Sequence, residues 1–463
     1  MVMTTVNRLQ SVRLPPLTTP WTDAVTGDAR LLRSVSDAFG GPVHLLDPAR
    51  FTANTRDFAA AFDDAAVTGS VYFGKKANKA SAFVDAIADL VTDDRRSGRS
   101  RRFGIDVASA GEFRQALAAG VRGVDLLVTG PHKPAELLTL AVRHDAIVTV
   151  DSPTELKSLA DLSRGLKVRI MLRVLPPGST SRFGMTDDEV VFAEKLATER
   201  KNDITLVGYS FHLSGYSIGD RRDQAHRLIE RIRAVRRSGL APTTISIGGG
   251  LPISYVQHEH WQQFLDPQAG HIFHAGKTFE SYYPYHSATT GAAALRAILT
   301  ETDSGGAPLA HVCQDNDISM FVEPGRALLD RAGITVFPVL GVKDRNPGII
   351  VIDGTSLSLS EQWFDTEFVP DPQLVSEHTP MNELPFFASV GAATCLESDM
   401  LTWRVIEFPY RPATGSYLVY HNTAGYQMDS NESAFHDTPV PPKVVVTLDD
   451  GHPRWTLDRR ETY

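Results

Sequence analysis

Cysteine is scarce in this chain, with only Cys313 and Cys395 among 463 residues. Two cysteines cannot form the disulfide framework of a small secreted domain, so they fit a reducing compartment. No stretch approaches the roughly 18 consecutive apolar residues of a membrane helix, and Met1–Leu14 lacks the apolar core of a secretory signal. A net charge of -9 argues against a nucleic-acid scaffold, which usually carries a basic stripe. We therefore expect a cytoplasmic protein with no membrane or nucleic-acid partner.

The chain does contain a regular alternation of short apolar runs with amphipathic, helix-like stretches. A chain of this length exceeds one ordinary core, which predicts two domains. The eight apolar runs are Val71–Gly74, Phe103–Val107, Val124–Val128, Ala146–Val150, Val168–Val174, Leu206–Leu213, Thr244–Ile247 and Ile318–Val322. Eight nearly continuous apolar strands separated by helices predict an α/β fold, a (β/α)8 TIM barrel.

After Arg326 the pattern changes to β-rich segments punctuated by proline and glycine. These segments are Gly333–Val342, Gly348–Ile352, Tyr417–Val419 and Lys443–Leu448. They predict a second, C-terminal antiparallel β domain. We expect an N-terminal arm and strand over 1–48 that pack on this domain, a barrel over 49–330 with an insertion near 256–310, and the β domain over 331–463.

Polar residues follow the apolar runs where a barrel keeps its chemistry, at the carboxyl ends of the strands. Lys76 follows the first run, and a lysine held there can form a Schiff base with pyridoxal phosphate. Asp106 ends the second run, and His212 ends the sixth. A lysine pair can equally be a solvated surface pair, and a lone histidine can be satisfied in the core.

Two glycine-containing segments follow the last two runs. Gly248-Gly249-Gly250 lets the backbone approach a phosphate closely, although three glycines can also be a flexible turn. In Glu323-Pro324-Gly325-Arg326 the glutamate can hydrogen-bond a pyridinium nitrogen, and the arginine can contribute to phosphate binding. The alternative is a surface pair of little energetic value.

With these motifs in order along nearly the whole chain, the sequence resembles the fold-type III pyridoxal phosphate decarboxylases, the ornithine, arginine and diaminopimelate decarboxylase group. The matching motifs are Phe73-Gly74-Lys75-Lys76-Ala77-Asn78, Asp106-Val107-Ala108-Ser109-Ala110-Gly111-Glu112, Gly130-Pro131-His132-Lys133, Val150-Asp151-Ser152, Ser181-Arg182-Phe183-Gly184, Ser210-Phe211-His212 and Cys395 with Asp399. The resemblance implies an alanine racemase-like barrel and a homodimer with shared active sites.

The resemblance also implies roles for single residues. Lys76, rather than Lys75, carries the cofactor; His212 stacks on its ring, and Glu323 is the partner of the ring nitrogen. The implied cofactor-binding set is Lys76, Asp106, His212, Gly248, Gly249, Gly250, Glu323, Gly325, Arg326 and Tyr426. Cys395 is the implied proton donor from the partner subunit, and Asp353, Cys395 and Asp399 are the implied substrate contacts. No metal is implied.

Three departures from the family pattern bear on the substrate. Ser214-Gly215 stands where the family usually has Gly-Ser, which puts a phosphate contact in doubt. Leu396 stands where the family usually has an acid that touches the distal end of the substrate. The insertion near 256–310 is rich in histidine and tyrosine, and is a candidate substrate lid or an ordered surface or dimer-contact segment. We therefore predict a decarboxylase of a non-standard or elaborated diamino or dicarboxylic amino acid. An amino-acid racemase or epimerase on the same fold and a non-catalytic regulatory homologue are the alternatives.

Overall fold

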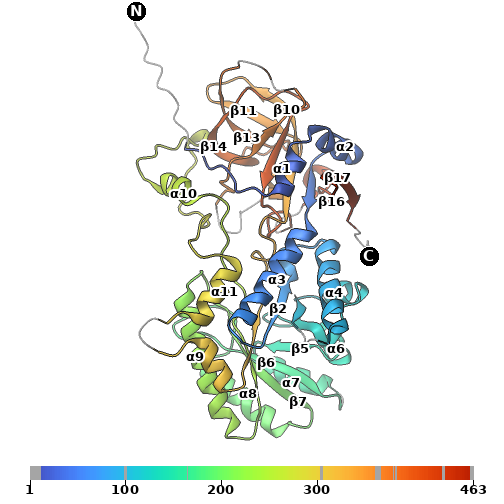
Figure 1. The fold of residues 1–463 in the computed structure, drawn as a ribbon, viewed down its shortest axis with the longest axis vertical. Helices are drawn as coiled ribbons and strands as arrows, with labels where there is room; N and C mark the ends of the chain where they lie inside the picture. Colours follow the sequence, from blue (N-terminus) through green and yellow to red (C-terminus); the bar gives the residue numbers. More distant parts are fainter. Residues whose placement is uncertain are drawn as a thin grey trace, which may run out of the picture. The chain divides into compact units, whose positions relative to one another are not determined.

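The computed structural model describes residues 12–98, 102–163, 165–302, 306–359, 366–378, 380, 383–429 and 433–458. The chain divides into two compact units (Figure 1). The barrel unit comprises Phe51–Pro252 and Thr289–Leu328, and the sheet unit comprises Met1–Arg50, Ile253–Ala288 and Leu329–Tyr463.

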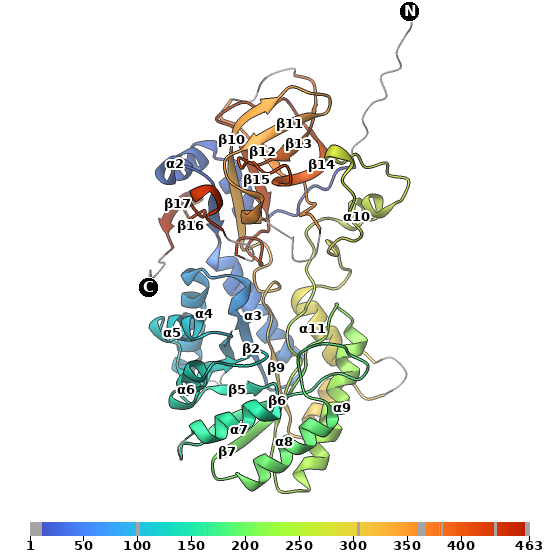
Figure 2. The ribbon, with the colours of Figure 1, turned by 180° about the vertical axis from the view of Figure 1, so that it is seen from behind.

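The barrel unit is a closed ring of eight parallel strands, β2 to β9 in chain order (Figures 1 and 2). The strands are β2 (Gly69–Gly74), β3 (Phe103–Val107), β4 (Leu126–Val128), β5 (Ile147–Val150), β6 (Val168–Arg173), β7 (Ile204–Ser210), β8 (Thr244–Ser246) and β9 (Ser319–Val322). Each of the eight predicted apolar runs overlaps one of them, which confirms the predicted barrel.

Helices alternate with these strands and cover the outside of the ring (Figure 2). They are α3 (Pro48–Asp64), α4 (Ser81–Arg96), α5 (Ala110–Ala118), α6 (Ala135–Arg143), α7 (Pro153–Leu162), α8 (Asp187–Glu199), α9 (Ile218–Arg236), α11 (Gly291–Thr300) and α12 (Leu309–Asp315), with short 3-10 turns η1 (Lys75–Ala77) and η2 (Gly123–Asp125). From α5 to α8 each helix packs beside the next, as expected for successive βα units.

Sequence signals explain where several of these helices begin. The side chain of Ser109 accepts a hydrogen bond from the backbone N–H of Glu112, and Ser152 does the same for Glu155. Such caps satisfy N–H groups that the first turn of a helix leaves without a partner. Two of the motifs predicted from the sequence therefore start α5 and α7 directly after β3 and β5.

The sheet unit holds one nine-stranded sheet with the order β14-β13-β11-β10-β1-β16-β17, in which β15 pairs with β10 and β12. Its strands are β1 (Val43–Leu46), β10 (Gly333–Lys343), β11 (Gly348–Ile352), β12 (Gln373–Val375), β13 (Phe386–Gly391), β14 (Met400–Phe408), β15 (Tyr417–His421), β16 (Lys443–Asp449) and β17 (His452–Leu457). Helices α1 (Pro20–Thr26) and α2 (Ala29–Phe39) contribute to its apolar core.

The sheet is mixed rather than purely antiparallel, which corrects our prediction in this detail. β1 pairs with β16 in parallel, and β11 pairs with β13 in parallel. Neither parallel pair joins consecutive strands by a tight turn, so no local turn signal predicts it.

The region that we expected as an insertion into the barrel, near 256–310, is divided between the units. Ile253–Ala288 groups with the sheet unit and includes α10 (His258–Leu265) and η3 (His274–Gly276). Within that unit Phe273 forms a β-bridge with Arg404 of β14. The hydroxyl of Tyr285 donates a hydrogen bond to the carbonyl of Glu367 at 3.1 Å. The segment therefore packs on the edge of the sheet through its aromatic side chains.

Among the residues that the structure describes, no helix is long and apolar enough to cross a membrane.

Candidate active site

Lys75 and Lys76 differ sharply in exposure where β2 ends and η1 begins. Lys75 is buried, with 1% of its surface exposed, whereas Lys76 is exposed. The positive charge of Lys76 opposes the raised pKa values of Asp106 and Glu323, so it lies close to both carboxyl groups. Lys76 therefore lies near both acids at the end of β2, whereas Lys75 is buried.

Two acids face the same region from opposite sides of β2. Asp106 ends β3, is buried, and accepts a hydrogen bond from the hydroxyl of Thr129 at 2.5 Å. Glu323 follows β9 and accepts a hydrogen bond from the hydroxyl of Ser246. Burial, reinforced by the negative charge of Asp106, raises the pKa of Glu323 to about 7. The barrel thus holds a carboxyl group that titrates near neutrality, as candidate functional groups often do.

The glycine triplet lies directly between His212 and Glu323. The backbone N–H of Glu323 donates to the carbonyl of Gly248 at 2.9 Å. A Cβ on Gly248, whose φ is +67°, would come within 2.7 Å of the carbonyl oxygen of Phe211, and one on Gly249 within 2.6 Å of that of Glu323. Glycine is therefore required here, because side chains would fill the space and strain the turn.

His212 follows β7 and part of the residue is exposed. Desolvation of its ring lowers the pKa of the imidazole to about 3, and the positive charges of Lys76, Arg173 and Arg221 contribute to this shift. The imidazole is therefore neutral at physiological pH, and a neutral ring can stack on a cofactor without adding a charge.

Gly325 and Arg326 lie in the turn that follows Glu323, and both are buried. The backbone N–H of Gly74 donates to the carbonyl of Pro324 at 3.1 Å, which joins this turn to the end of β2. The structure thus brings together all the barrel residues that the sequence nominated.

Arg173, at the end of β6, belongs to the same region and was not predicted. Its charge opposes the raised pKa values of Asp106 and Glu323. Its guanidinium carbon lies 4.7 Å from the centre of the Phe183 ring, and its Nη1 lies 3.7 Å from a carboxylate oxygen of Asp151. An arginine at the carboxyl end of a barrel strand is the signal that would have identified it.

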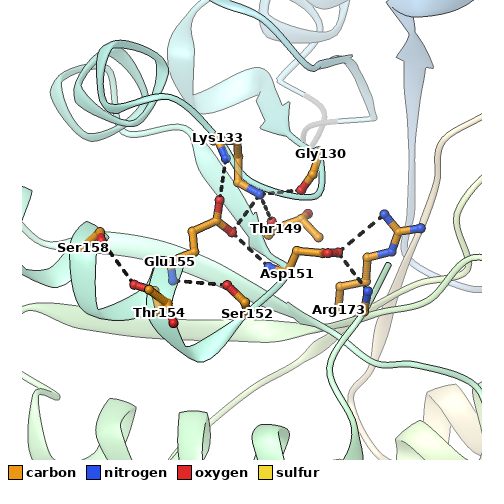
Figure 3. A network of polar contacts seen from close by, with 10 residues as sticks. Gly130, Lys133, Thr149, Asp151, Ser152, Thr154, Glu155, Ser158 and Arg173 are labelled. Carbon is orange, nitrogen blue, oxygen red and sulfur yellow. Dashed lines mark hydrogen bonds and ion pairs between the residues drawn. The ribbon is translucent and has the colours of Figure 1, made fainter. Parts of the chain in front are cut away.

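A buried network of hydrogen bonds and one ion pair holds the backbone of Asp151 (Figure 3). The ammonium of Lys133 lies 2.9 Å from the carboxylate of Glu155 and donates to the carbonyls of Gly130 and Thr149. Glu155 also accepts a hydrogen bond from the backbone N–H of Asp151 at 3.0 Å. Because the ammonium of Lys133 and both carboxylate oxygens of Glu155 have partners, this network fixes the ends of β4 and β5 relative to α7.

The remaining predicted residues belong to the sheet unit. Asp353 follows β11 and is half-buried, and burial raises its pKa. Cys395 and Leu396 are exposed on the turn between β13 and β14. Tyr426 has a φ of +80°, a strained value for a residue other than glycine that often marks functional positions.

Asp399 is buried, and both of its carboxylate oxygens already accept hydrogen bonds. One oxygen accepts from the backbone N–H of Ser356 at 2.7 Å, and the other from the hydroxyl of Thr394 at 2.5 Å. These two bonds hold the turn that carries Cys395, and the predicted substrate contact of Asp399 stays a prediction.

The barrel residues fit pyridoxal phosphate. The triplet leaves a cradle of backbone that a Cβ would fill, and backbone N–H groups at such turns favour a phosphate. Glu323 offers a carboxyl group for a ring nitrogen, and Lys76 offers an accessible amine. No cluster of three or more potential metal ligands occurs in the described part of the chain.

Comparisons with known proteins agree with this geometry. The model of the pyridoxal-dependent decarboxylase family, pyridoxal binding domain, matches residues 49–283. A Sinorhizobium fredii protein, itself called uncharacterized, is 35% identical over 96% of this chain and 96% of its own length. The diaminopimelate decarboxylase of Bacillus subtilis is 22% identical over 93% of this chain and 91% of its own.

Solved structures share the fold. Diaminopimelate decarboxylase from M. jannaschii in complex with L-lysine has a TM-score of 0.71 at 18% identity, covering 92% of this chain and 91% of that one. The arginine decarboxylase of Paramecium bursaria Chlorella virus has a TM-score of 0.65 at 17% identity, covering 90% of this chain and 99% of that one. The predicted resemblance is thereby confirmed, and with it the enzyme class and the cofactor. The chain belongs to the pyridoxal-dependent decarboxylases, enzymes that use pyridoxal phosphate to release carbon dioxide from amino acids.

Proposed function

We propose that this enzyme decarboxylates a non-standard or elaborated diamino or dicarboxylic amino acid, with Lys76 as the covalent anchor of the cofactor. The observation that carries the proposal is the convergence of Lys76, Asp106, His212 and Glu323 at one end of the barrel, around the glycine triplet. When bound, pyridoxal phosphate supplies the electron sink for the electron pair that carbon dioxide leaves behind.

The barrel residues hold the cofactor and set the charge on its ring. Lys76 is accessible and Lys75 is buried. Only Lys76 can therefore hold the cofactor covalently and give up that bond to the amine of the substrate. Glu323, held by Ser246, gives the ring nitrogen a hydrogen-bond partner whose negative charge favours a protonated nitrogen. His212 is a neutral ring at the mouth and would stack on the ring of the bound cofactor.

The substrate class follows from the turn that carries Cys395. Leu396 has 51% of its surface exposed, and an apolar side chain there offers no charge to a distal ammonium group. Asp353 supplies a half-buried carboxylate elsewhere in the sheet unit. Relatives named diaminopimelate decarboxylase and a structural neighbour named arginine decarboxylase act on amino acids with charged distal ends. We therefore propose a substrate whose distal amine is absent or modified.

We further propose that the active enzyme is a homodimer in which Cys395 of one subunit donates a proton to the product carbon in the other. Two observations support this role: the thiol is exposed, and Asp399 holds its turn in place. Cys395→Ala should then slow product formation without weakening cofactor binding, because the thiol acts after carbon dioxide has left.

The test is carbon dioxide release from a panel of basic, dicarboxylic and conjugated amino acids, with and without added pyridoxal phosphate. Lys76→Ala removes the anchor, and Lys79→Ala, at an exposed lysine in the same segment, is the matched control. We expect cofactor-dependent release with one conjugated or non-standard substrate, lost in Lys76→Ala and kept in Lys79→Ala.

Preference for ornithine, lysine or diaminopimelate over every elaborated substrate would contradict the proposed substrate class. Sedimentation of the holoenzyme tests the dimer separately. Inactive Lys76→Ala and Cys395→Ala subunits, when mixed, should regain activity if the sites are shared. Failure of this mixture to recover, with dimers still formed, would contradict the shared site.

A further inference from the structure

Arg221 lies in the first turn of α9 and is buried, with 1% of its surface exposed. An arginine is almost never buried unless a carboxylate pairs with it. In the part of the chain that the structure describes, the guanidinium of Arg221 forms no ion pair, and its hydrogen bonds all go to backbone carbonyls. This makes Arg221 an unusual group within the barrel.

Its contacts connect two loops. Nη1 donates to the carbonyl of Ser217 at 3.1 Å, and Nη2 donates to that of Gly215 at 2.9 Å. Nη2 also lies 3.5 Å from the carbonyl oxygen of Leu213 and 3.3 Å from that of Gly249. The guanidinium thus joins the loop after His212 to the glycine triplet after β8.

The triplet leaves no room for a larger residue beside this guanidinium. A Cβ on Gly250 would lie 2.5 Å from Nη2 of Arg221. The Nε of Arg221 is buried and has no hydrogen-bond partner. The positive end of the α9 dipole adds to the charge at the same place, because Arg221 lies in the first turn of this 19-residue helix.

Neutral carbonyls accept hydrogen bonds from Nη1 and Nη2 but leave Nε without a partner. Burial lowers the pKa of the guanidinium although the charges of Tyr216 and Asp220 oppose this shift. Burial of a charge is costly, and a bound anion offsets that cost. The adjacent loop is the glycine triplet, whose backbone is suited to a phosphate. The ligand chemistry that fits is therefore a phosphate monoester.

We propose that Arg221 is a positioning residue of the phosphate cradle: it fixes the loop after His212 against the glycine triplet and places a buried positive charge beside the phosphate of the cofactor. The inference deepens the proposed function and rests on the same cofactor. It also bears on Ser214-Gly215, which stands where the family usually has Gly-Ser. Arg221 holds this loop through the carbonyls of Leu213 and Gly215, so the loop does not depend on a serine side chain at the usual position.

The experiment compares affinities for pyridoxal phosphate and for pyridoxal, which lacks the phosphate, in the apoenzyme of each variant. Arg221→Met removes the charge and the donors. Arg222→Met is the matched control, since Arg222 is buried on the same helix and donates to the carbonyl of Glu301 instead. We expect Arg221→Met to weaken the binding of pyridoxal phosphate by about 30-fold and that of pyridoxal by less than about threefold. Arg222→Met should change the ratio of these two affinities by less than about threefold.

Inorganic phosphate provides a readout that does not involve the ring of the cofactor. It should compete with pyridoxal phosphate for the wild-type apoenzyme and raise its melting temperature, and it should do neither in Arg221→Met. If Arg221→Met does not fold, Arg221→Lys keeps the charge but reaches fewer of the carbonyls, and its affinity ratio should fall by about three- to tenfold.

The inference is overturned if pyridoxal phosphate and pyridoxal lose affinity equally in the folded Arg221 variant, or if inorganic phosphate competes equally well in variant and wild type. Both results would leave the proposed decarboxylase intact. Wild-type enzyme that binds pyridoxal phosphate no better than pyridoxal, and releases no carbon dioxide, would instead contradict the proposed function itself.

Discussion

The buried pair of Lys133 and Glu155 provides the sharpest test of how the barrel is held together. The side chains are 1% and 0% exposed, and their charged atoms lie 2.9 Å apart. Glu155 also accepts hydrogen bonds from the backbone N–H groups of Lys133 at 2.8 Å and of Asp151 at 3.0 Å. Removing the carboxylate therefore strands a buried ammonium and two backbone donors at once.

The expected cost follows from these contacts. Breaking one side of a buried ion pair costs about 3–5 kcal/mol, because the other charge stays buried. Glu155→Leu should therefore destabilise the barrel by about 4 kcal/mol or more, and Lys133→Met by about 3 kcal/mol. The double variant should cost at least about 2 kcal/mol less than the sum of the two, since neither charge is then left alone.

The assay can separate the two units because the tryptophans that the structure describes, Trp21, Trp261, Trp403 and Trp455, all lie in the sheet unit. Urea unfolding of the apoprotein followed by far-ultraviolet circular dichroism reports the helices of the barrel, and tryptophan fluorescence reports the sheet unit. The dichroism transition should move to lower urea. Glu199→Leu, which breaks an exposed pair with Lys195, should shift it by less than about 0.5 kcal/mol. If the double variant loses as much stability as the two single variants together, the charges of Lys133 and Glu155 are not coupled and the prediction is wrong.

Two further predictions concern the sheet unit. Burial raises the pKa of Glu367 to about 7 from 4.5, so this carboxyl stabilises the fold below about pH 4.5 and that stabilisation is lost as the pH rises through 7. Glu367→Gln should therefore raise stability at pH 8, relative to pH 5, by up to about 3 kcal/mol in tryptophan-monitored unfolding; a difference below about 0.5 kcal/mol would contradict this. Asp399→Ala frees the turn that carries Cys395, so it should cost about 1–3 kcal/mol and speed the reaction of Cys395 with a thiol reagent. Buried Cys313 serves as the unreactive control, and an unchanged rate at Cys395 would count against the holding role of Asp399.

The barrel could be predicted from the sequence because its strands are buried on both faces. Val148 and Val150 of β5, for example, continue an apolar run that no amphipathic helix would contain. The strand ends then identify Lys76, Asp106 and Glu323, since polar residues that interrupt such runs collect at one end of the ring.

Other parts could not be predicted in this way. The strand β17 (His452–Leu457) is mostly exposed, so it has no apolar pattern to detect. β1 and β16 pair in parallel although nearly the whole chain separates them. Arg221 looks like one more solvated residue in the arginine-rich helix α9, and only the contacts of its guanidinium identify it as a buried cation.

The unit to which Ile253–Ala288 belongs could not be predicted from its composition. Its histidines and tyrosines fit a substrate lid as well as an ordered surface or dimer-contact segment, and composition carries no information about which unit a loop packs on. Its aromatic contacts, such as Tyr285 with Phe368 at 5.7 Å between ring centres, group it with the sheet unit.

The role of Lys76 is decided by locating the covalent link between the protein and the cofactor. Holoenzyme reduced with borohydride and digested with chymotrypsin yields a modified peptide whose tandem mass spectrum distinguishes Lys75 from Lys76. We expect the phosphopyridoxyl group on Lys76, which is exposed at the mouth of the barrel, because Lys75 is buried. A label on Lys75, or no label in a preparation that binds the cofactor, would contradict this expectation.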